Sequence, residues 1–167
     1  GFCPAGEARH FVADGNIASE LAVRANITLV VSGGNARSES YELVGPIAER
    51  TLSGLNLDVV FLGVDGISVS GGLTTHHEIE AQTNKVMLTR AQRVIVVAES
   101  SKIGKRGFAK ISDISSASDI VTDAEADAED IEAIERRGPK GHVVNMAPDQ
   151  DGLRTGSPSR SRRSSGR

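Results

Sequence analysis

A continuous apolar run at residues 58–63 constrains the fold of this chain more than any other stretch. Its sequence, Asp58-Val-Val-Phe-Leu-Gly63, has the composition of a β-strand that is buried on both faces of a parallel sheet. Further strand-like runs occur at residues 27–32, 94–98 and 119–122, and helical patterns lie between them. Strands that alternate with amphipathic helices predict an α/β fold with a mainly parallel sheet and helices on both faces.

Helix start and stop signals divide the rest of the chain. Asn16 is expected to cap a helix that runs to about residue 25. Pro46 stands at the first position of a second helix, which Gly54 ends. Asp127 is expected to cap a helix that stops at Gly138. Short strands are expected at residues 41–44, 108–111 and 142–146.

The region from Gly63 to Glu80 is predicted to be the functional centre. Gly71 and Gly72 lead into two threonines, and Thr75 with Glu78 fits the capping box of a helix over residues 76–92. A glycine-rich turn before a helix presents free backbone N–H groups and the positive end of the helix dipole, which bind phosphates. The alternative is an ordinary turn before a well-capped helix. The helix is expected to bury Ile79, Val86, Met87 and Ala91.

Three loops that follow strands are expected to form one ligand site. They cover residues 33–37, 63–75 and 99–104, and ligands of parallel sheets bind beyond the carboxyl ends of the strands. Lys102 is a candidate partner for a phosphate, and Arg37 could make a bidentate contact to the same group. The alternative is that Lys102 is a solvated loop lysine and Arg37 a surface arginine, neither with a role in binding. The predicted ligand-binding residues are Arg37, Asp65, Gly71, Gly72, Thr74, Thr75, Glu80 and Lys102.

Composition and missing motifs exclude several classes of function. Aromatic residues make up 3 % of the chain and the net charge is −3, which argues against a broad nucleic-acid surface. The chain shows neither GxxxxGK[ST] nor GxGxxG, so no nucleotide cofactor is expected. His76 and His77 are adjacent and no Cys/His group has zinc spacing, so no metal is expected either. Without an apolar span or a signal peptide, a soluble cytoplasmic protein is expected.

The predicted organisation has three parts. Residues 1–14 are weakly patterned, residues 15–146 form the folded domain, and residues 147–167 form a tail. The tail holds five Arg against two Asp, a net charge of +3, and is expected to be disordered. It is either a weak nucleic-acid contact or, as the simpler interpretation, a non-functional extension.

Many pieces of the chain occur in an order that resembles the C-terminal effector-sensing domain of DeoR-type bacterial transcriptional regulators. The resemblance extends from about residue 16 to 146. Its pieces are residues 16–22, 31–34 with Arg37, 43–46, 58–67, 71–75, 80–81, 91–97, 100–104 and 119–123.

The resemblance implies a fold similar to ribose-5-phosphate isomerase, and a phosphorylated sugar as the effector of a repressor of sugar metabolism. In such a site Gly72, Thr74 and Thr75 would help to hold the ligand, Lys102 would meet its charge and Asp65 would contact its hydroxyl groups. The resemblance also implies a homo-oligomer and a sensor without enzymatic activity.

The chain departs from the family pattern in three ways. Family members usually begin with a winged helix-turn-helix, and the sequence shows no such pattern. DNA contact is expected only through such a segment. A first strand with a Gly-Thr-Thr phosphate loop is expected before residue 1. Glu99 stands where the family more often has Asp. Two alternatives therefore stay open, an isomerase-like enzyme with Asp65 and Glu80 as acid/base groups and a non-functional fragment.

Overall fold

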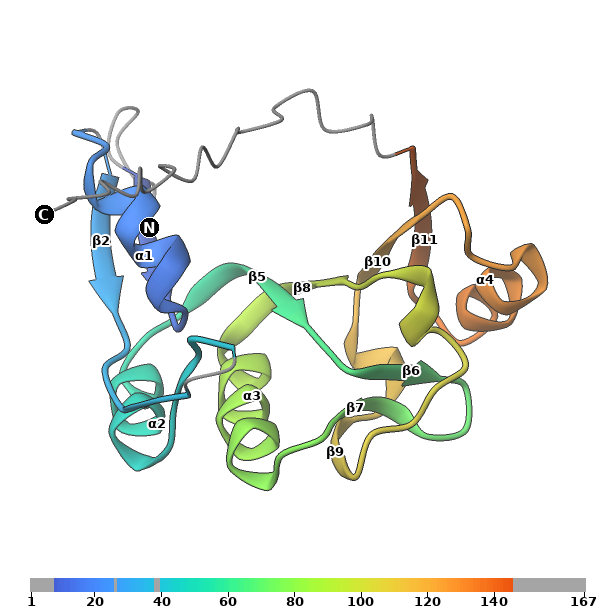
Figure 1. The fold of residues 1–167 in the computed structure, drawn as a ribbon, viewed down its shortest axis with the longest axis horizontal. Coiled ribbons are helices and arrows are strands. Elements are labelled where there is room, and N and C mark those ends of the chain that lie inside the picture. The colour runs from blue at the N-terminus through green and yellow to red at the C-terminus, as the bar shows by residue number, and fades with distance from the viewer. Residues whose placement is uncertain (1–7, 26, 38–39, 146–167) are drawn as a thin grey trace, which may run out of the picture.

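The computed structural model describes residues 8–145 except 26 and 38–39 (Figure 1). Its centre is a four-stranded, all-parallel sheet with the strand order β11-β10-β8-β5. The strands are β5 (Leu57–Gly63), β8 (Ala91–Val97), β10 (Asp119–Asp123) and β11 (Lys140–Val144). The predicted α/β fold with a mainly parallel sheet is confirmed.

A second parallel pair precedes this sheet in the chain. It consists of β1 (Ala8–Val12) and β2 (Ile27–Val31), joined by α1 (Gly15–Ala22). β1 lies in the segment that was predicted to be weakly patterned. The prediction that Asn16 caps α1 is wrong, because the Asp14 carboxylate accepts hydrogen bonds from the backbone N–H groups of Asn16 and Ile17 at 2.8 and 2.9 Å.

The next segment forms a small hairpin and a helix. β3 (Asn35–Ala36) pairs antiparallel with β4 (Leu43–Val44), and α2 (Pro46–Ser53) follows directly. Helix α2 begins at the predicted proline and is capped at its end by Gly54, as expected. It buries Ala48 and Leu52 and packs beside α3.

The glycine region forms an antiparallel sheet, with a turn at residues 69–71 between its first two strands. β6 (Gly66–Ser68), β7 (Gly72–Thr75) and β9 (Ala109–Ser112) pair in the order β6-β7-β9. Gly72 has φ +77°, and a Cβ there would lie 2.1 Å from the Ser112 carbonyl oxygen. The glycine therefore permits a close approach of two strands. Residues 72–75 form a strand where a glycine turn leading into a helix was predicted, and anion binding by these residues stays a prediction.

Helix α3 (Glu78–Arg90) starts later than predicted. Its N-cap is His77, without a side-chain hydrogen bond, so the predicted capping box is wrong. Met87 is buried as predicted, and Val86 and Ala91 are partly buried against the core, but Ile79 is 57 % exposed, contrary to prediction. Beside Met87 the helix buries Glu80, Ala81, Thr83 and Asn84, a largely polar face that apolar periodicity does not reveal.

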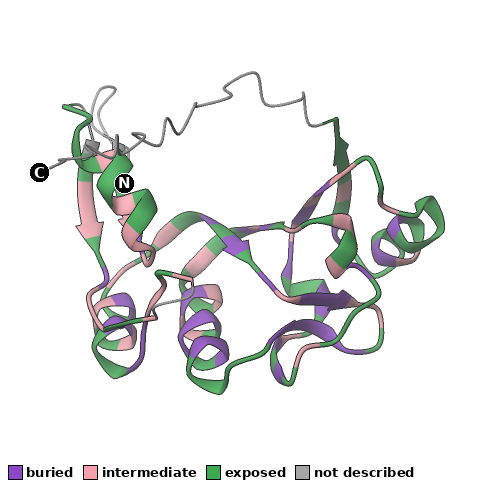
Figure 2. Cartoon of the chain, in the orientation of Figure 1, coloured by how far each residue is buried: buried purple, intermediate pink, exposed green. Residues whose placement is uncertain are grey.

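The core lies between the parallel sheet, the antiparallel sheet and three helices, α2, α3 and α4 (Ala128–Glu135). Val60 and Leu62 of β5 are buried in it, together with residues of these helices, among them Leu52 of α2. Figure 2 shows buried residues along α3, β6 and β7, whereas α1 has none. On the other face of β5, Phe61 is 71 % exposed, so the prediction that this strand is buried on both faces is wrong within the described residues.

Two short 3-10 helices complete the described chain, η1 (Ser100–Lys102) and η2 (Ile114–Ser116). Within residues 8–145, gaps excepted, no helix is long and apolar enough to cross a membrane. The predicted tail at residues 147–167 lies outside the described residues, so its disorder stays a prediction.

Candidate functional site

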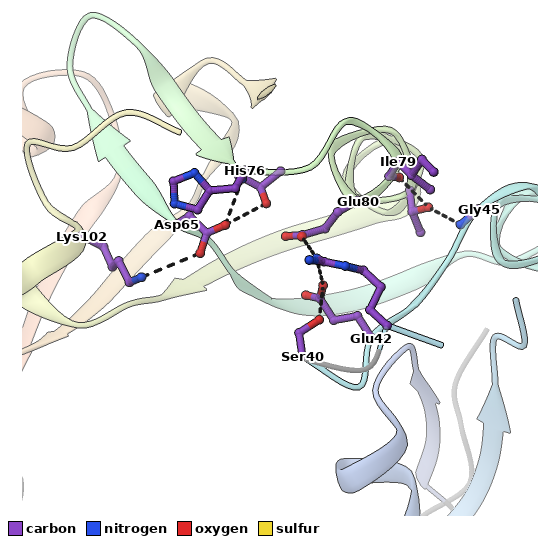
Figure 3. Close-up of polar contacts among 11 residues, drawn as sticks. Ser40, Glu42, Gly45, Asp65, His76, Ile79, Glu80 and Lys102 are labelled. Atoms are coloured by element: carbon purple, nitrogen blue, oxygen red, sulfur yellow. Dashed lines mark hydrogen bonds and ion pairs between the residues drawn. The ribbon is translucent and has the colours of Figure 1, made fainter. Parts of the chain in front are cut away.

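Asp65 is the hub of a polar cluster directly after β5. Its Oδ2 accepts hydrogen bonds from the Thr75 hydroxyl at 2.9 Å and from the His76 backbone N–H at 3.0 Å. Its Oδ1 lies 3.7 Å from Nζ of Lys102 (Figure 3). Thr75 of β7 and Lys102 of η1 thus both lie beside the Asp65 carboxylate, which follows the end of β5.

The surroundings of Asp65 favour its ionised form. Partial burial of the carboxyl acts to raise its pKa, but the hydrogen bonds from His76 and Thr75 act in the opposite direction. The charges of His76 and Lys102 add to that effect, and the pKa of Asp65 lies below its ordinary value. Asp65 is therefore a fixed negative acceptor at neutral pH.

A second cluster surrounds Arg37, which follows β3. Its Nη1 contacts Oε2 of Glu80 at very short range and Oε2 of Glu42 at 3.3 Å. The Ser40 hydroxyl also donates to Oε2 of Glu42, at 3.1 Å. The Glu80 side chain is 6 % exposed, so this charge is nearly removed from water and needs its guanidinium partner.

Burial raises the pKa of Glu42, and the negative charge of Glu80 raises it further. The hydrogen bond from Ser40 and the charge of Arg37 oppose these two effects without cancelling them. Two carboxylates that share one guanidinium thus leave an excess of negative charge at this point.

The two clusters are neighbours along the chain and in space. His76 touches Asp65, and Glu80 follows in the first turn of α3. Figure 3 shows Lys102, Asp65 and His76 on one side of the start of α3, and Glu80, Glu42 and Ser40 on the other. Five of the predicted site residues are thus brought to one edge of the molecule, namely Arg37, Asp65, Thr75, Glu80 and Lys102.

This edge lies beyond the carboxyl end of the outermost strand of the parallel sheet. Strand β5 is the last in the order β11-β10-β8-β5, and β1 and β2 form a separate two-stranded sheet (Figure 1). Asp65 follows β5, and Arg37 comes from the segment after β2. In open α/β sheets ligands bind beyond the carboxyl ends of the strands.

The other three predicted site residues serve the antiparallel sheet. The Thr74 hydroxyl donates to the Gly66 carbonyl at 3.1 Å and accepts from the Gly107 N–H at 2.8 Å. The Gly71 N–H donates to the Ser68 hydroxyl at 3.0 Å. Gly72 packs against the backbone of β9. These side-chain and N–H groups are engaged inside the protein, and the Thr74 carbonyl accepts a hydrogen bond from the Asp65 backbone N–H at 2.9 Å.

Sequence reasoning missed Ser40 and Glu42 as members of the site and considered His76 only as a metal ligand. The pairing of β3 with β4 brings Glu42 opposite Arg37, whose backbone N–H donates to the Glu42 carbonyl at 2.9 Å. Strands β3 and β4 have only two residues each, which is too short to show a periodicity, so no pattern in the sequence indicated this neighbour.

A separate open cleft lies at the carboxyl ends of β8 and β10. It has a volume of about 430 Å³ and includes none of the predicted site residues. Its lining residues are Glu99, Ser100, Ser101, Asp123, Ala124, Glu125 and Asn145. In the part of the chain that the structure describes, no three His, Cys, Asp or Glu side chains are grouped so as to hold a metal ion.

Comparison with known proteins identifies similar sequences. A family model described as the DeoR C terminal sensor domain matches residues 12–124. A putative aga operon transcriptional repressor of Escherichia coli O157:H7 is 35 % identical over 123 residues, which are 74 % of this chain and 46 % of that protein.

Two further relatives are regulators as well. The HTH-type transcriptional regulator GlpR of Haloferax volcanii is 37 % identical over 65 % of this chain and 42 % of its own length. The glycerol-3-phosphate regulon repressor of Escherichia coli K12 is 28 % identical over 65 % of this chain and 43 % of its own length. The chain spans about half the length of these curated relatives.

Proposed function

Because the chain belongs to the family of DeoR C-terminal sensor domains, we propose that it binds a phosphorylated sugar as the effector of a transcriptional regulator of sugar metabolism. The observation that carries the proposal is the polar edge where Asp65, Lys102, Arg37 and Glu80 gather beyond the carboxyl end of β5. Charged donors and acceptors that converge beyond strand ends suit a small polyhydroxy ligand.

The names of the relatives support the same class of ligand. One is named for a glycerol-3-phosphate regulon and another for the aga operon, and both are described as repressors. In such a regulator the effector would act by binding one arrangement of the protein more tightly than another. DNA contact would come from a helix-turn-helix segment, and the sensor would work as a homo-oligomer.

Two features of the site favour a sensor over an isomerase. A general base needs a pKa near the working pH and access to the proton that it takes. The pKa of Asp65 lies below its ordinary value, and Glu80 is nearly buried in an ion pair with Arg37. We therefore expect no turnover of ribose 5-phosphate by the folded chain. Turnover that disappears in Glu80→Gln would favour the enzyme instead.

The test is a thermal unfolding experiment on the chain with a panel of ligands: ribose 5-phosphate, glucose 6-phosphate, galactose 6-phosphate and glycerol 3-phosphate. A ligand that binds only the native state at 100 times its Kd stabilises it by about 2.7 kcal/mol. We expect one compound to raise the melting temperature, and Asp65→Asn to abolish that rise.

Asp58→Asn is the matched control, because Asp58 is exposed on β5 and lies outside both clusters. A cooperative melt that no compound shifts would refute the proposed function. A broad, non-cooperative melt would show that the chain does not fold by itself, which is the fragment interpretation.

A further inference from the structure

We propose that two copies of this chain dimerise through the outer face of the parallel sheet, an inference that rests on the homo-oligomer of the proposed function. The outer face is the face of β5, β8, β10 and β11 that points away from the core. Side chains alternate along a strand, and Val60 and Leu62 of β5 are in the core, so Val59 and Phe61 lie on the outer face. The strand register adds four more apolar side chains to this face, namely Ile95, Val97, Val121 and Val144.

The helices that the structure describes leave the outer face open. Helices α2, α3 and α4 contribute to the core on the other face, and α1 packs on β1 and β2. Figure 1 shows α2, α3 and the antiparallel sheet on one side of β5 and β8. Phe61 is 71 % exposed, and Val59, Val97 and Val144 are exposed as well. All-parallel sheets are normally covered on both faces, and an exposed apolar patch of this kind marks an interaction surface.

A second copy of the same face fits this surface through a two-fold axis. In such a dimer each copy contributes the same patch, so the patch must be complementary to itself. Two sheets that pack face to face keep their strands within about 30° of alignment. If the axis crosses the strands between Phe61 and Gly63, the strands of the two copies run antiparallel, and Phe61 of each copy lies over Gly63 of the other. Ile95 then lies over Val97 of the other copy, because the register pairs Ile95 with Phe61 and Val97 with Gly63.

Gly63 provides the space that this arrangement needs. It is exposed, and no atom lies within 4 Å of a Cβ built there. The Phe61 ring therefore meets backbone and not a side chain when it packs across the two-fold axis. An aromatic side chain that is buried in this way removes about 150–250 Å² of surface from water. The phenylalanine and the glycine thus form a complementary pair that occurs twice in the dimer.

Charges at the two ends of the outer face favour the antiparallel arrangement. The amino end of β8 carries Arg93, whose side chain stays 56 % exposed beside Asp119, and the amino end of β11 carries the exposed Lys140. The carboxyl ends carry Asp123 on β10 and the exposed Glu99, two residues after β8. The same two-fold axis brings Arg93 of one copy to Glu99 of the other. A parallel arrangement would place like charges together, which weakens binding.

Sedimentation equilibrium of the whole chain, without any effector, tests the dimer. We expect Phe61→Arg to raise the dimer dissociation constant about thirtyfold or more, because an aromatic anchor is lost and an unpaired charge enters the interface. Ile47→Arg is the matched control, since Ile47 is 62 % exposed on α2 and lies outside the outer face. Far-UV circular dichroism checks that each variant is folded. If Phe61→Arg does not fold, Val97→Arg replaces it, because Val97 is exposed on the same face.

A charge variant tests the antiparallel arrangement. Glu99→Arg would place two arginines together at each end of the interface, so we expect it to weaken the dimer about fivefold at low salt and less at high salt. Glu129→Arg makes the same change of charge in the first turn of α4, outside the outer face. This control should leave the dissociation constant unchanged.

A monomeric wild type would overturn the inference, as would a dimer that Phe61→Arg weakens no more than Ile47→Arg does. Equal effects of Glu99→Arg and Glu129→Arg would overturn the antiparallel arrangement. Failure of every panel compound to shift the melting temperature would refute the proposed effector and would leave these dissociation constants unchanged. The two failures are therefore distinguishable.

Discussion

Arg93 donates a hydrogen bond from Nε to Oδ2 of Asp119 at 2.8 Å, across the β8–β10 strand pair. The second oxygen of Asp119 lies 2.8 Å from Nε2 of His142 on β11. The Asp119 side chain is only 4 % exposed, so one buried carboxylate joins three neighbouring strands. The hydrogen bond from Arg93 is the main reason that the pKa of Asp119 falls to about 2, and the bond from His142 is the next.

Asp119→Asn is expected to reduce the loss of folding stability that occurs when the pH is lowered. Because the folded-state pKa lies below the ordinary value of 3.8, the stabilisation by ionised Asp119 is complete above that value and is lost as pH falls through it towards about 2. Urea unfolding of both chains between pH 5 and pH 2 checks this. The wild type should lose more stability over that range than the variant, and parallel curves would contradict the assignment.

Leu73→Ala is expected to destabilise the protein by about 2–5 kcal/mol. Leu73 is fully buried in β7, so truncation leaves a cavity between the two sheets. Ile79→Ala is the matched comparison, because Ile79 is 57 % exposed and its loss should cost less than about 0.5 kcal/mol. Denaturant unfolding measures both, and equal losses would contradict the observed face of α3.

The strands and helices with strong local signals were predictable from sequence. The run at residues 58–63 is β5, Pro46 starts α2, and Asp127 caps α4 through the Glu129 N–H at 2.8 Å. These signals are local, because they depend on apolar runs, the fixed φ of proline and one side-chain hydrogen bond.

The elements that were mispredicted depend on contacts distant in sequence. Residues 72–75 form a strand because β9, more than thirty residues later, pairs with them. The polar face of α3 is buried because Thr83 and Glu80 meet Gly45 and Arg37 from earlier segments. For the site, the approach of Asp65 to Lys102 follows from strand order, whereas Glu42 joins the site because two very short strands, β3 and β4, pair with each other.

Asp14→Ala is expected to cost about 1 kcal/mol of stability, the usual value of an N-cap. Asn16→Ala should cost little, since Asn16 only supplies its backbone N–H to Asp14. Chemical denaturation of the two variants compares the caps directly. A larger loss of stability in Asn16→Ala than in Asp14→Ala would support Asn16 as the N-cap of α1, as the sequence pattern predicted.

Gly72→Ala is expected to destabilise the antiparallel sheet by more than about 1 kcal/mol, because its φ is +77° and the new Cβ would lie 2.1 Å from the Ser112 carbonyl oxygen. Gly63→Ala is the control, since nothing lies within 4 Å of a Cβ built there. Melting temperatures of both variants measure the difference. Similar values would show that β7 and β9 do not approach so closely.

Thr75→Val is expected to raise the pKa of Asp65 towards its ordinary value. The Thr75 hydroxyl donates to Oδ2 at 2.9 Å, and its removal takes away one of the two hydrogen bonds that lower this pKa. The His76 N–H still donates at 3.0 Å, so the shift should be partial. A carboxyl-carbon NMR titration of Asp65 measures it, with Thr89→Val, on the exposed side of α3, as the control. An unchanged pKa in a folded Thr75→Val chain would mean that the backbone N–H alone holds Asp65 ionised, and that Thr75 only fills space beside it.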